Sequence, residues 1–275
     1  MRNNEDRMAV SSETPVLEQP NVNNLNYVIP TEIVELPSKG MFYPTDHPLH
    51  QQKTIEIKHM TAKEEDILTS STYIQQGVVL DYLLQSLIID KRIDPATLLM
   101  GDKNAIFLNA RINGYGEEYE VESRCQECGT TDSIVHNLRE IKYKVFNKNV
   151  EAQDGEISFK LPKLGHVVTV KFLNSKEEAA LQREGDKREK LNLPINATTV
   201  FLKTIITSIN GVLNRGGALY DFIDSLPAMD SKHIKKTYIE SQPDIDFTIE
   251  VECKKCSTIQ GGELPITAEF FWPNS

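Results

Sequence analysis

The sequence predicts an α+β protein in which a strand–helix–helix–strand–C-x-x-C unit occurs twice, with the two copies meeting at a zinc-ribbon-like site. Three observations lead to this prediction. All four cysteines fall in two C-x-x-C pairs, and short alternating segments are followed by helix start signals. The same order of elements also recurs in the second part of the chain.

Length and composition set the limits of this prediction. The chain has 275 residues, of which 39% are hydrophobic and 25% charged, as expected of a globular protein with one or two domains. A net charge of −10 argues against a large non-specific nucleic-acid surface. No apolar run reaches membrane-spanning length, and the first ten residues lack the apolar stretch of a signal peptide. We therefore expect no membrane association. Because the chain has two metal-type cysteine pairs and no other cysteine, we also expect a reducing, cytoplasmic setting.

The first element is an N-terminal arm. Residues 1–26 are rich in Asn, Glu, Ser and Pro without periodicity and are expected to be flexible. Two related halves, residues 27–148 and 149–275, should follow.

The first half begins with a turn-rich segment, Glu35–Pro44, whose prolines exclude a helix and whose aromatic residues look exposed. A strand is predicted at 54–58, followed by a helix with Thr61 and Glu64 as its capping box. Further predictions are a buried helix at 78–89, a helical turn from Asp94, and strands at 105–112 and 119–123 joined across residues 113–116. Residues 104–109 are also compatible with a helix.

The second half is predicted to follow the same plan. Residues 156–161 and 166–172 should form a hairpin, and Asn174 or Ser175 should cap the next helix. The charged segment 182–192 either extends that helix or forms a loop. Residues 214–217 break the pattern. Helices are expected at 200–209, 220–226 and 231–240, and a strand at 246–252.

Three alignments favour an internal duplication over chance similarity of helix starts. Residues 58–65 align with 171–178, an offset of 113 (171 − 58). Residues 100–103 align with 229–232, an offset of 129 (229 − 100), and the cysteine pairs align at 128 (253 − 125). About sixteen extra residues should therefore lie between 181 and 229.

The cysteine pairs are Cys125/Cys128 and Cys253/Cys256. Each C-x-x-C turn presents two thiolates on one side of a bend, which is half of a tetrahedral zinc shell. We expect these four residues to bind one structural Zn²⁺ between the two halves. Disulfides and a redox dithiol are the alternatives, although neither pair begins a helix as a redox motif would.

Other chemistry-bearing residues favour structural interpretations. The histidines are dispersed and outside metal-binding or catalytic frames, and those at 47 and 50 are expected to be solvated: His47, His50, His59, His136, His166 and His233. Acidic residues at the helix starts 64–66 and 177–178 fit capping better than acid–base catalysis. Trp272 could pack on the two C-x-x-C turns or contact a partner, and packing is favoured. No nucleophile or phosphate-loop motif is present, so we expect no catalytic residues and no enzyme.

The chain resembles the T4-type bacteriophage baseplate hub and hub-assembly proteins of contractile tails. The resemblance rests on the order of Glu35–Pro44, Met60–Asp66, Leu99–Ala105 and the C-x-x-C pairs, and spans Val28 to Trp272. It implies a non-enzymatic role in building the baseplate hub, as an assembly factor with a chaperone-like role or as a hub subunit. It transfers no catalytic residues and no metal ligands.

The function expected from these observations is that of a phage tail-assembly protein with a structural zinc site. Its partners would be other tail and baseplate hub proteins, and the tape measure, bound through exposed apolar surface and residues 37–44. It would act in the host cytoplasm during assembly and could enter the virion tail. The alternative is a zinc-ribbon regulator that binds nucleic acid, for which Lys254 and Lys255 form only a small basic patch.

Overall fold

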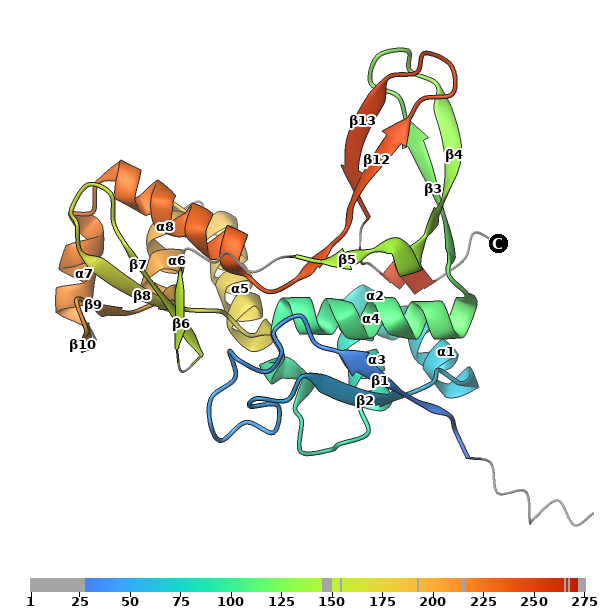
Figure 1. Cartoon of the computed structure of the whole chain (residues 1–275), viewed down its shortest axis with the longest axis horizontal. Coiled ribbons are helices and arrows are strands. Elements are labelled where there is room, and N and C mark those ends of the chain that lie inside the picture. Colours follow the sequence, from blue (N-terminus) through green and yellow to red (C-terminus); the bar gives the residue numbers. More distant parts are fainter. Residues whose placement is uncertain are drawn as a thin grey trace, which may run out of the picture.

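The computed structural model describes residues 28–144, 150–153, 155–191, 193–213, 216–264, 266 and 268–271. The predicted N-terminal arm (1–26), residues 214 and 215 of the predicted break at 214–217, and Trp272 lie outside these residues. The chain is a mixed α+β protein with small antiparallel sheets. Figure 1 shows helix α4 (Met100–Tyr115) at the centre, a lobe containing the five-stranded sheet on one side, and a projecting arm of two hairpins.

The first hairpin pairs β1 (Thr31–Glu35) with the predicted strand β2 (Thr54–Lys58). The segment between them folds back on α4, because Ser38 and Tyr43 donate hydrogen bonds to the buried Asp102. Ser38 N and Oγ lie 3.0 and 2.6 Å from the carboxylate, and the Tyr43 hydroxyl lies 2.7 Å away. Phe42 and Tyr43 are consequently buried, 6% and 2% exposed. The expectation that the aromatic side chains of this segment are exposed was wrong.

Helix α1 (Ala62–Leu68) begins at the predicted capping box. The Glu64 side chain accepts from the Thr61 amide at 2.9 Å, and Thr61 in turn caps the helix. α2 (Ser71–Gln76) follows, and α3 (Val79–Leu87) buries four apolar side chains within the predicted range 78–89. The predicted turn after Asp94 is the short 3-10 helix η2 (Pro95–Thr97), capped by the Asp94 side chain.

Helix α4 replaces the strand predicted at 105–112, so that prediction was wrong and the helical alternative was right. Its buried residues lie on nearly every side, including Ala105, Ile106, Phe107 and Leu108. A helix covered on all sides has no single apolar stripe, so its sequence lacks the 3.6-residue period. The predicted connection at 113–116 is the C-terminal end of this helix, where Gly116 has a φ of 88°.

The strand predicted at 119–123 does form, but with a different partner. β3 (Glu118–Arg124) pairs with β4 (Thr131–Asn137) across the first cysteine pair, and β12 (Thr248–Glu252) pairs with β13 (Ile259–Glu263) across the second. These two hairpins form the arm (Figure 1). At its base, β5 (Lys142–Tyr143) pairs with β11 (Ile245–Asp246), and the short helices η3 (Leu138–Glu140) and η4 (Ala268–Phe271) pack on α4.

The lobe contains a five-stranded antiparallel sheet in the order β10-β9-β8-β7-β6. The predicted hairpin is β7 with β8, and the charged segment extends helix α5 rather than forming a loop. The helix predicted at 200–209 ends at Ile205, because Ile206–Ile209 leave it to pair with β8. The bounds of the lobe elements are β6 (Glu151–Gln153), β7 (Glu156–Lys160), β8 (Val167–Lys171), α5 (Ser175–Lys190), α6 (Ala197–Ile205), β9 (Ile206–Ile209), β10 (Val212–Leu213), α7 (Gly217–Asp224) and α8 (Ala228–Ser241).

One hydrophobic cluster runs through both parts of the molecule, from Val34 to Phe271. Phe42 of the first hairpin meets Phe172 of the lobe edge-on, with ring centroids 4.8 Å apart. The backbone joins the parts as well, because Ser175 N donates to the Leu98 carbonyl at 3.0 Å. Within the described residues, no helix has both the length and the apolar character needed to cross a membrane.

Candidate metal centre

Each cysteine pair occupies a tight turn at the tip of one hairpin. In the first turn, Cys125 N donates to the Thr130 carbonyl at 2.8 Å and Gly129 N donates to the Cys125 carbonyl at 3.0 Å. The second turn has the same bonds, from Cys253 N to Thr258 O at 3.0 Å and from Ser257 N to Cys253 O at 2.8 Å. The residue after each pair has a positive φ, 71° at Gly129 and 54° at Ser257. The two turns therefore aim their thiols in the same way relative to the strands that carry them.

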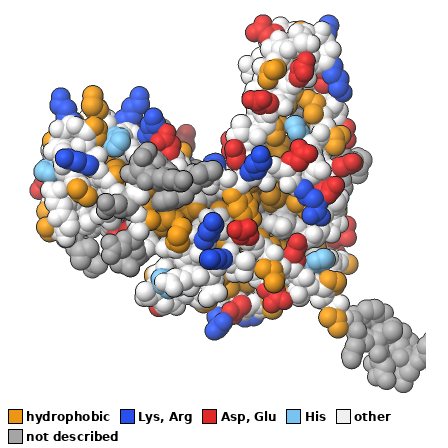
Figure 2. Space-filling model, viewed as in Figure 1, with side chains coloured by type: hydrophobic (Ala, Val, Ile, Leu, Met, Phe, Trp, Pro, Cys, Tyr) orange, Lys and Arg blue, Asp and Glu red, His pale blue; other side chains and the backbone are white. Residues whose placement is uncertain are grey.

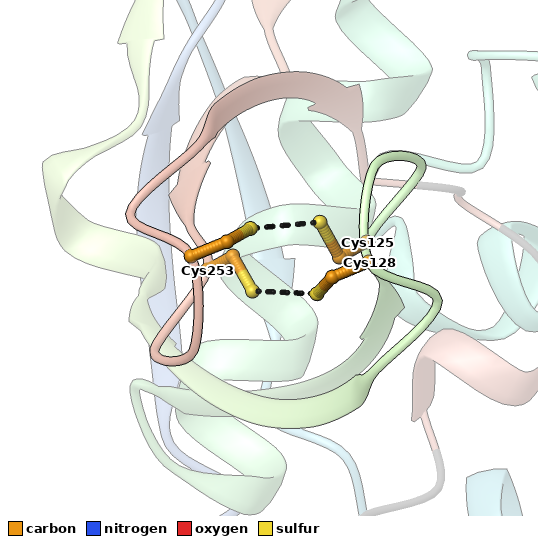
Figure 3. Close-up of side chains that lie close together, drawn as sticks. Cys125, Cys128 and Cys253 are labelled. Carbon is orange, nitrogen blue, oxygen red and sulfur yellow. Dashed lines mark hydrogen bonds between the residues drawn. The ribbon is translucent and has the colours of Figure 1, made fainter.

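The structure brings all four cysteines together, although the two pairs are 128 residues apart in the chain. Their Sγ atoms all lie within 4.8 Å of one another. Cys125 Sγ is 3.6 Å from Cys256 Sγ, and Cys128 Sγ is 3.6 Å from Cys253 Sγ, so each of these contacts joins one hairpin to the other. Figure 3 shows Cys125 and Cys128 projecting from one turn toward Cys253 on the other.

These distances match the size of a four-thiolate metal shell. With Zn–S bonds of about 2.3 Å, the sulfur atoms of a regular tetrahedron lie about 3.8 Å apart. A disulfide instead requires about 2.05 Å between two sulfur atoms, and all four cysteines are free thiols. The donor set and its dimensions therefore fit a closed tetrahedral site for a thiophilic cation.

The surroundings of the cluster act on the thiols unequally. The hydroxyl and backbone of Thr130 lower the pKa of Cys128 to about 6, and Thr258 lowers the pKa of Cys256 in the same way. Backbone amides at Cys256 and Lys255 act to lower the pKa of Cys253, but burial and the neighbouring thiols raise it to about 11. The neighbouring thiols thus disfavour a negative charge on Cys253, and a bound divalent cation would relieve that repulsion.

Residues beside the cysteines hold the two hairpin tips in register. Gln260 of β13 accepts from the Gln126 amide at 3.1 Å and donates to Ser123 Oγ at 2.9 Å. Lys254 Nζ donates to the Ser133 carbonyl at 3.3 Å. Sequence reasoning missed these contacts. It also missed the roles of Thr130 and Thr258, although the C-x-x-C-x-T pattern shared by the two turns was a visible signal for them. The tips are therefore positioned by protein contacts as well as by the cysteines.

Burial of the cluster is one-sided. Cys125 and Cys253 are each 3% exposed, Cys128 is half-buried and Cys256 is exposed. Among the described residues, these cysteines form the one group of three or more His, Cys, Asp or Glu side chains close enough to hold a metal ion. A shell filled by four protein sulfur atoms leaves no position for substrate, so its chemistry is that of a structural centre.

Three other residues considered from sequence, His47, His50 and Glu64, make structural contacts. His47 and His50 were expected to be solvated loop residues rather than ligands; both lie in turns and are half-buried. His47 Nε2 lies 2.8 Å from Thr97 Oγ1 and its ring stacks on Tyr43, while His50 Nδ1 lies 2.8 Å from the Tyr43 carbonyl oxygen. Glu64 takes part in the capping box, as predicted, and its side chain is fully buried there.

The fold and this cluster define a class: a mixed α+β protein whose projecting arm carries a four-cysteine, metal-type centre. The family model described as T4 bacteriophage base plate protein matches residues 30–272, so the chain belongs to that family. No curated protein and no solved structure gives a significant match. The family resemblance found in the sequence is thereby confirmed, and it assigns the chain to the baseplate of a phage tail.

Proposed function

We propose that the protein is a non-enzymatic component that helps to assemble the baseplate hub, and that one structural Zn²⁺ links its two halves. The observation that carries this proposal is the meeting of two cysteine turns from distant parts of the chain, with all four Sγ atoms within 4.8 Å. Family membership supplies the baseplate context. The hub assignment, as assembly factor or as hub subunit, extends the family result to a particular part of the baseplate.

Zinc is proposed on the chemistry of the donors. Four thiolates favour Zn²⁺ or another soft thiophilic ion over Mg²⁺ or Ca²⁺, which require oxygen ligands. The ligands would be Cys125, Cys128, Cys253 and Cys256. Because each turn supplies two of them, the ion would bind two hairpins that otherwise touch through few side-chain bonds.

A duplicated chain, with halves at 27–148 and 149–275, would explain why the ligands come from distant segments. The cysteines, the starts of α4 and α8, and the buried acids Asp102 and Asp230 all share an offset of 128. The offset of 129 aligned Met100 with Met229, whereas the helix starts favour 128.

Further pairs of contacts support the same relationship. Asp102 accepts from the Ser38 amide, and Asp230 accepts from the amides of Lys163 and Leu164 at 2.8 and 3.0 Å, each in a turn that begins Leu-Pro. Lys58 and Glu64 pair at one capping box, and Lys171 and Glu177 pair at the other, at an offset of 113. On this proposal, the β12–β13 hairpin extends away from α8 and joins the β3–β4 hairpin over α4.

The partners on this proposal are other proteins of the phage tail, including hub components and the tape measure. Residues 37–44 are not proposed as a docking segment, because their aromatic side chains are buried. Assembly would take place in the host cytoplasm and could leave the protein in the virion tail. Co-expression with the other baseplate proteins of the same phage should give a stoichiometric complex by size-exclusion chromatography. Failure to associate with any of them would overturn the proposed function.

The alternative of a nucleic-acid regulator is disfavoured by the charge of the arm. Exposed glutamates line both hairpins, and Figure 2 shows acidic side chains along the arm. The two lysines of the second cysteine turn, Lys254 and Lys255, are exposed. Such a surface repels phosphates at most positions. Filter binding at low salt should therefore detect no retention of DNA or RNA. Retention that falls steeply with added salt would favour the regulator instead.

A further inference from the structure

The lobe has a groove of about 420 Å³ that is lined by residues of α5, α6 and α8. Its floor is buried: Leu173 and Tyr238 are 2% and 4% exposed, and the Leu173 amide donates to the Tyr238 hydroxyl at 3.1 Å. The Phe201 ring meets Tyr238 edge-on at 5.1 Å. Leu181, Ile195, Ala197 and Val200 complete the apolar lining. None of the residues of α5 is buried, so this helix presents its groove side to solvent.

The rim of the groove is acidic. Glu178, Glu184, Asp186 and Glu189 line it, and no Lys or Arg does. Within the described residues, the half-buried Glu178 carboxylate makes no hydrogen bond or salt bridge; burial raises its pKa, and the charge of Lys103 acts to lower it. Lys103 forms its salt bridge with Asp81 instead, so a cation from outside the chain would supply the direct partner that Glu178 lacks.

Most basic residues of α5 lie outside the groove. Arg183, Lys187 and Lys190 line a second hollow, which they share with Asp186 of the groove rim. Arg188 secures the wall, because its guanidinium donates to Glu184 at 2.9 Å and to the Pro194 carbonyl at 3.3 Å. No Lys or Arg therefore lines the groove itself, and Arg188 neutralises one of its four rim acids.

Gly185 lines the groove in the middle of α5. Glycine inside a helix lowers helix stability relative to most residues, so it needs a compensating reason. A Cβ atom added there would meet nothing within 4 Å, which means that the fold does not require the missing side chain. The glycine instead leaves the groove open to close approach by another backbone.

We propose that this groove binds an amphipathic helix of a neighbouring baseplate protein, with its apolar face on Phe201 and Tyr238 and a Lys or Arg paired with Glu178. A helix fits because α5 and α6 form the two walls of a helix-in-groove site, and the 16 residues of α5 extend about 24 Å. This inference rests on the proposed function, since it names the chemistry of the partner.

The first test is Gly185→Leu in the co-expressed complex. Leucine fills the groove while improving helix propensity, so Tm should stay equal or rise and binding of the partner should weaken at least about a hundredfold. Gly217→Leu is the matched control, because this helical glycine also has open space around it but lies on α7 outside the groove. The control should bind like wild type.

Glu178→Gln tests the charge and should weaken binding about five- to thirtyfold, with the difference shrinking at high salt. A photo-cross-linker at position 182 should capture a partner peptide that carries Lys or Arg.

The outcomes separate the two proposals. Wild-type protein that binds no baseplate protein overturns the proposed function. A complex that survives Gly185→Leu overturns only the groove assignment. A groove cross-link to a second copy of this chain, with self-association lost in Gly185→Leu, overturns the assignment to a neighbouring protein.

Discussion

Replacing Glu64 with glutamine tests the buried ion pair at the start of α1. The Glu64 side chain is 0% exposed and accepts from Lys58, Ser86 and Thr61. Burial acts to raise the pKa of Glu64, but these hydrogen bonds lower it from 4.5 to about 2. At about 1.36 kcal/mol per pKa unit, this difference corresponds to about 3.4 kcal/mol of folding stability at neutral pH. Because glutamine keeps part of the hydrogen bonding, we expect Glu64→Gln to cost about 2–3 kcal/mol at pH 7.

The pH dependence follows from the direction of the shift. A carboxylate with a lowered folded-state pKa stabilises the fold above the unfolded pKa, and this stabilisation is lost as pH falls from about 4.5 through about 2. With these pKa values, the contribution at pH 3 should fall to about 1.4 kcal/mol. Urea denaturation of wild type and variant at pH 7 and pH 3 measures both values.

Glu177→Gln is the matched control for this experiment. Glu177 occupies the same capping-box position in α5 and pairs with Lys171, but its side chain is 28% exposed. We expect a cost of about 0.5–1 kcal/mol there. Equal losses in the two variants, or a Glu64→Gln loss that does not shrink at pH 3, would refute the reasoning.

Three further substitutions probe the centre of the fold, each read by thermal and urea denaturation. Arg111→Ala removes a buried guanidinium that donates to three backbone carbonyls, and should cost about 2–4 kcal/mol, whereas exposed Arg92→Ala should shift the midpoint little. Asp102→Ala leaves the Ser38 and Tyr43 donors without an acceptor and should also cost about 2–4 kcal/mol. A loss below about 1 kcal/mol would show that these hydrogen bonds do not hold the segment between β1 and β2 on α4. Phe271→Ala empties a site that is 0% exposed beside Phe107 and should cost about 3–5 kcal/mol, while an unchanged midpoint would show that η4 does not support α4.

Local signals in the sequence predicted those parts of the fold that local physics determines. The capping boxes at Thr61 and Asn174 and the hairpin around Gly165 form as predicted, because their contacts join residues close in the chain. The C-x-x-C spacing predicted four cysteines in one place, and the geometry of the turns explains how each pair is presented.

The failures occur where distant contacts decide the structure. Residues 105–112 of α4 were predicted as a strand. The helix is covered on all sides, so its sequence lacks the helical period that would have identified it. Ile206–Ile209 leave the predicted helix because β8 offers an edge to pair with. The hydrogen bond from Ser38 to Asp102 joins residues 64 positions apart, and no local pattern in the sequence predicts it. The strands β4 and β13, which complete the arm, were not predicted at all.

Zinc stoichiometry is the measurement that tests the central claim most directly. Elemental analysis of purified full-length protein should find one zinc per chain, and X-ray absorption should show four sulfur ligands at about 2.3 Å. Cys253→Ser should lose the metal and melt at a lower temperature, because it removes a ligand supplied by the β12–β13 hairpin. Folded, soluble wild-type protein without metal, or a Cys253→Ser variant with full zinc and unchanged melting, would contradict the account.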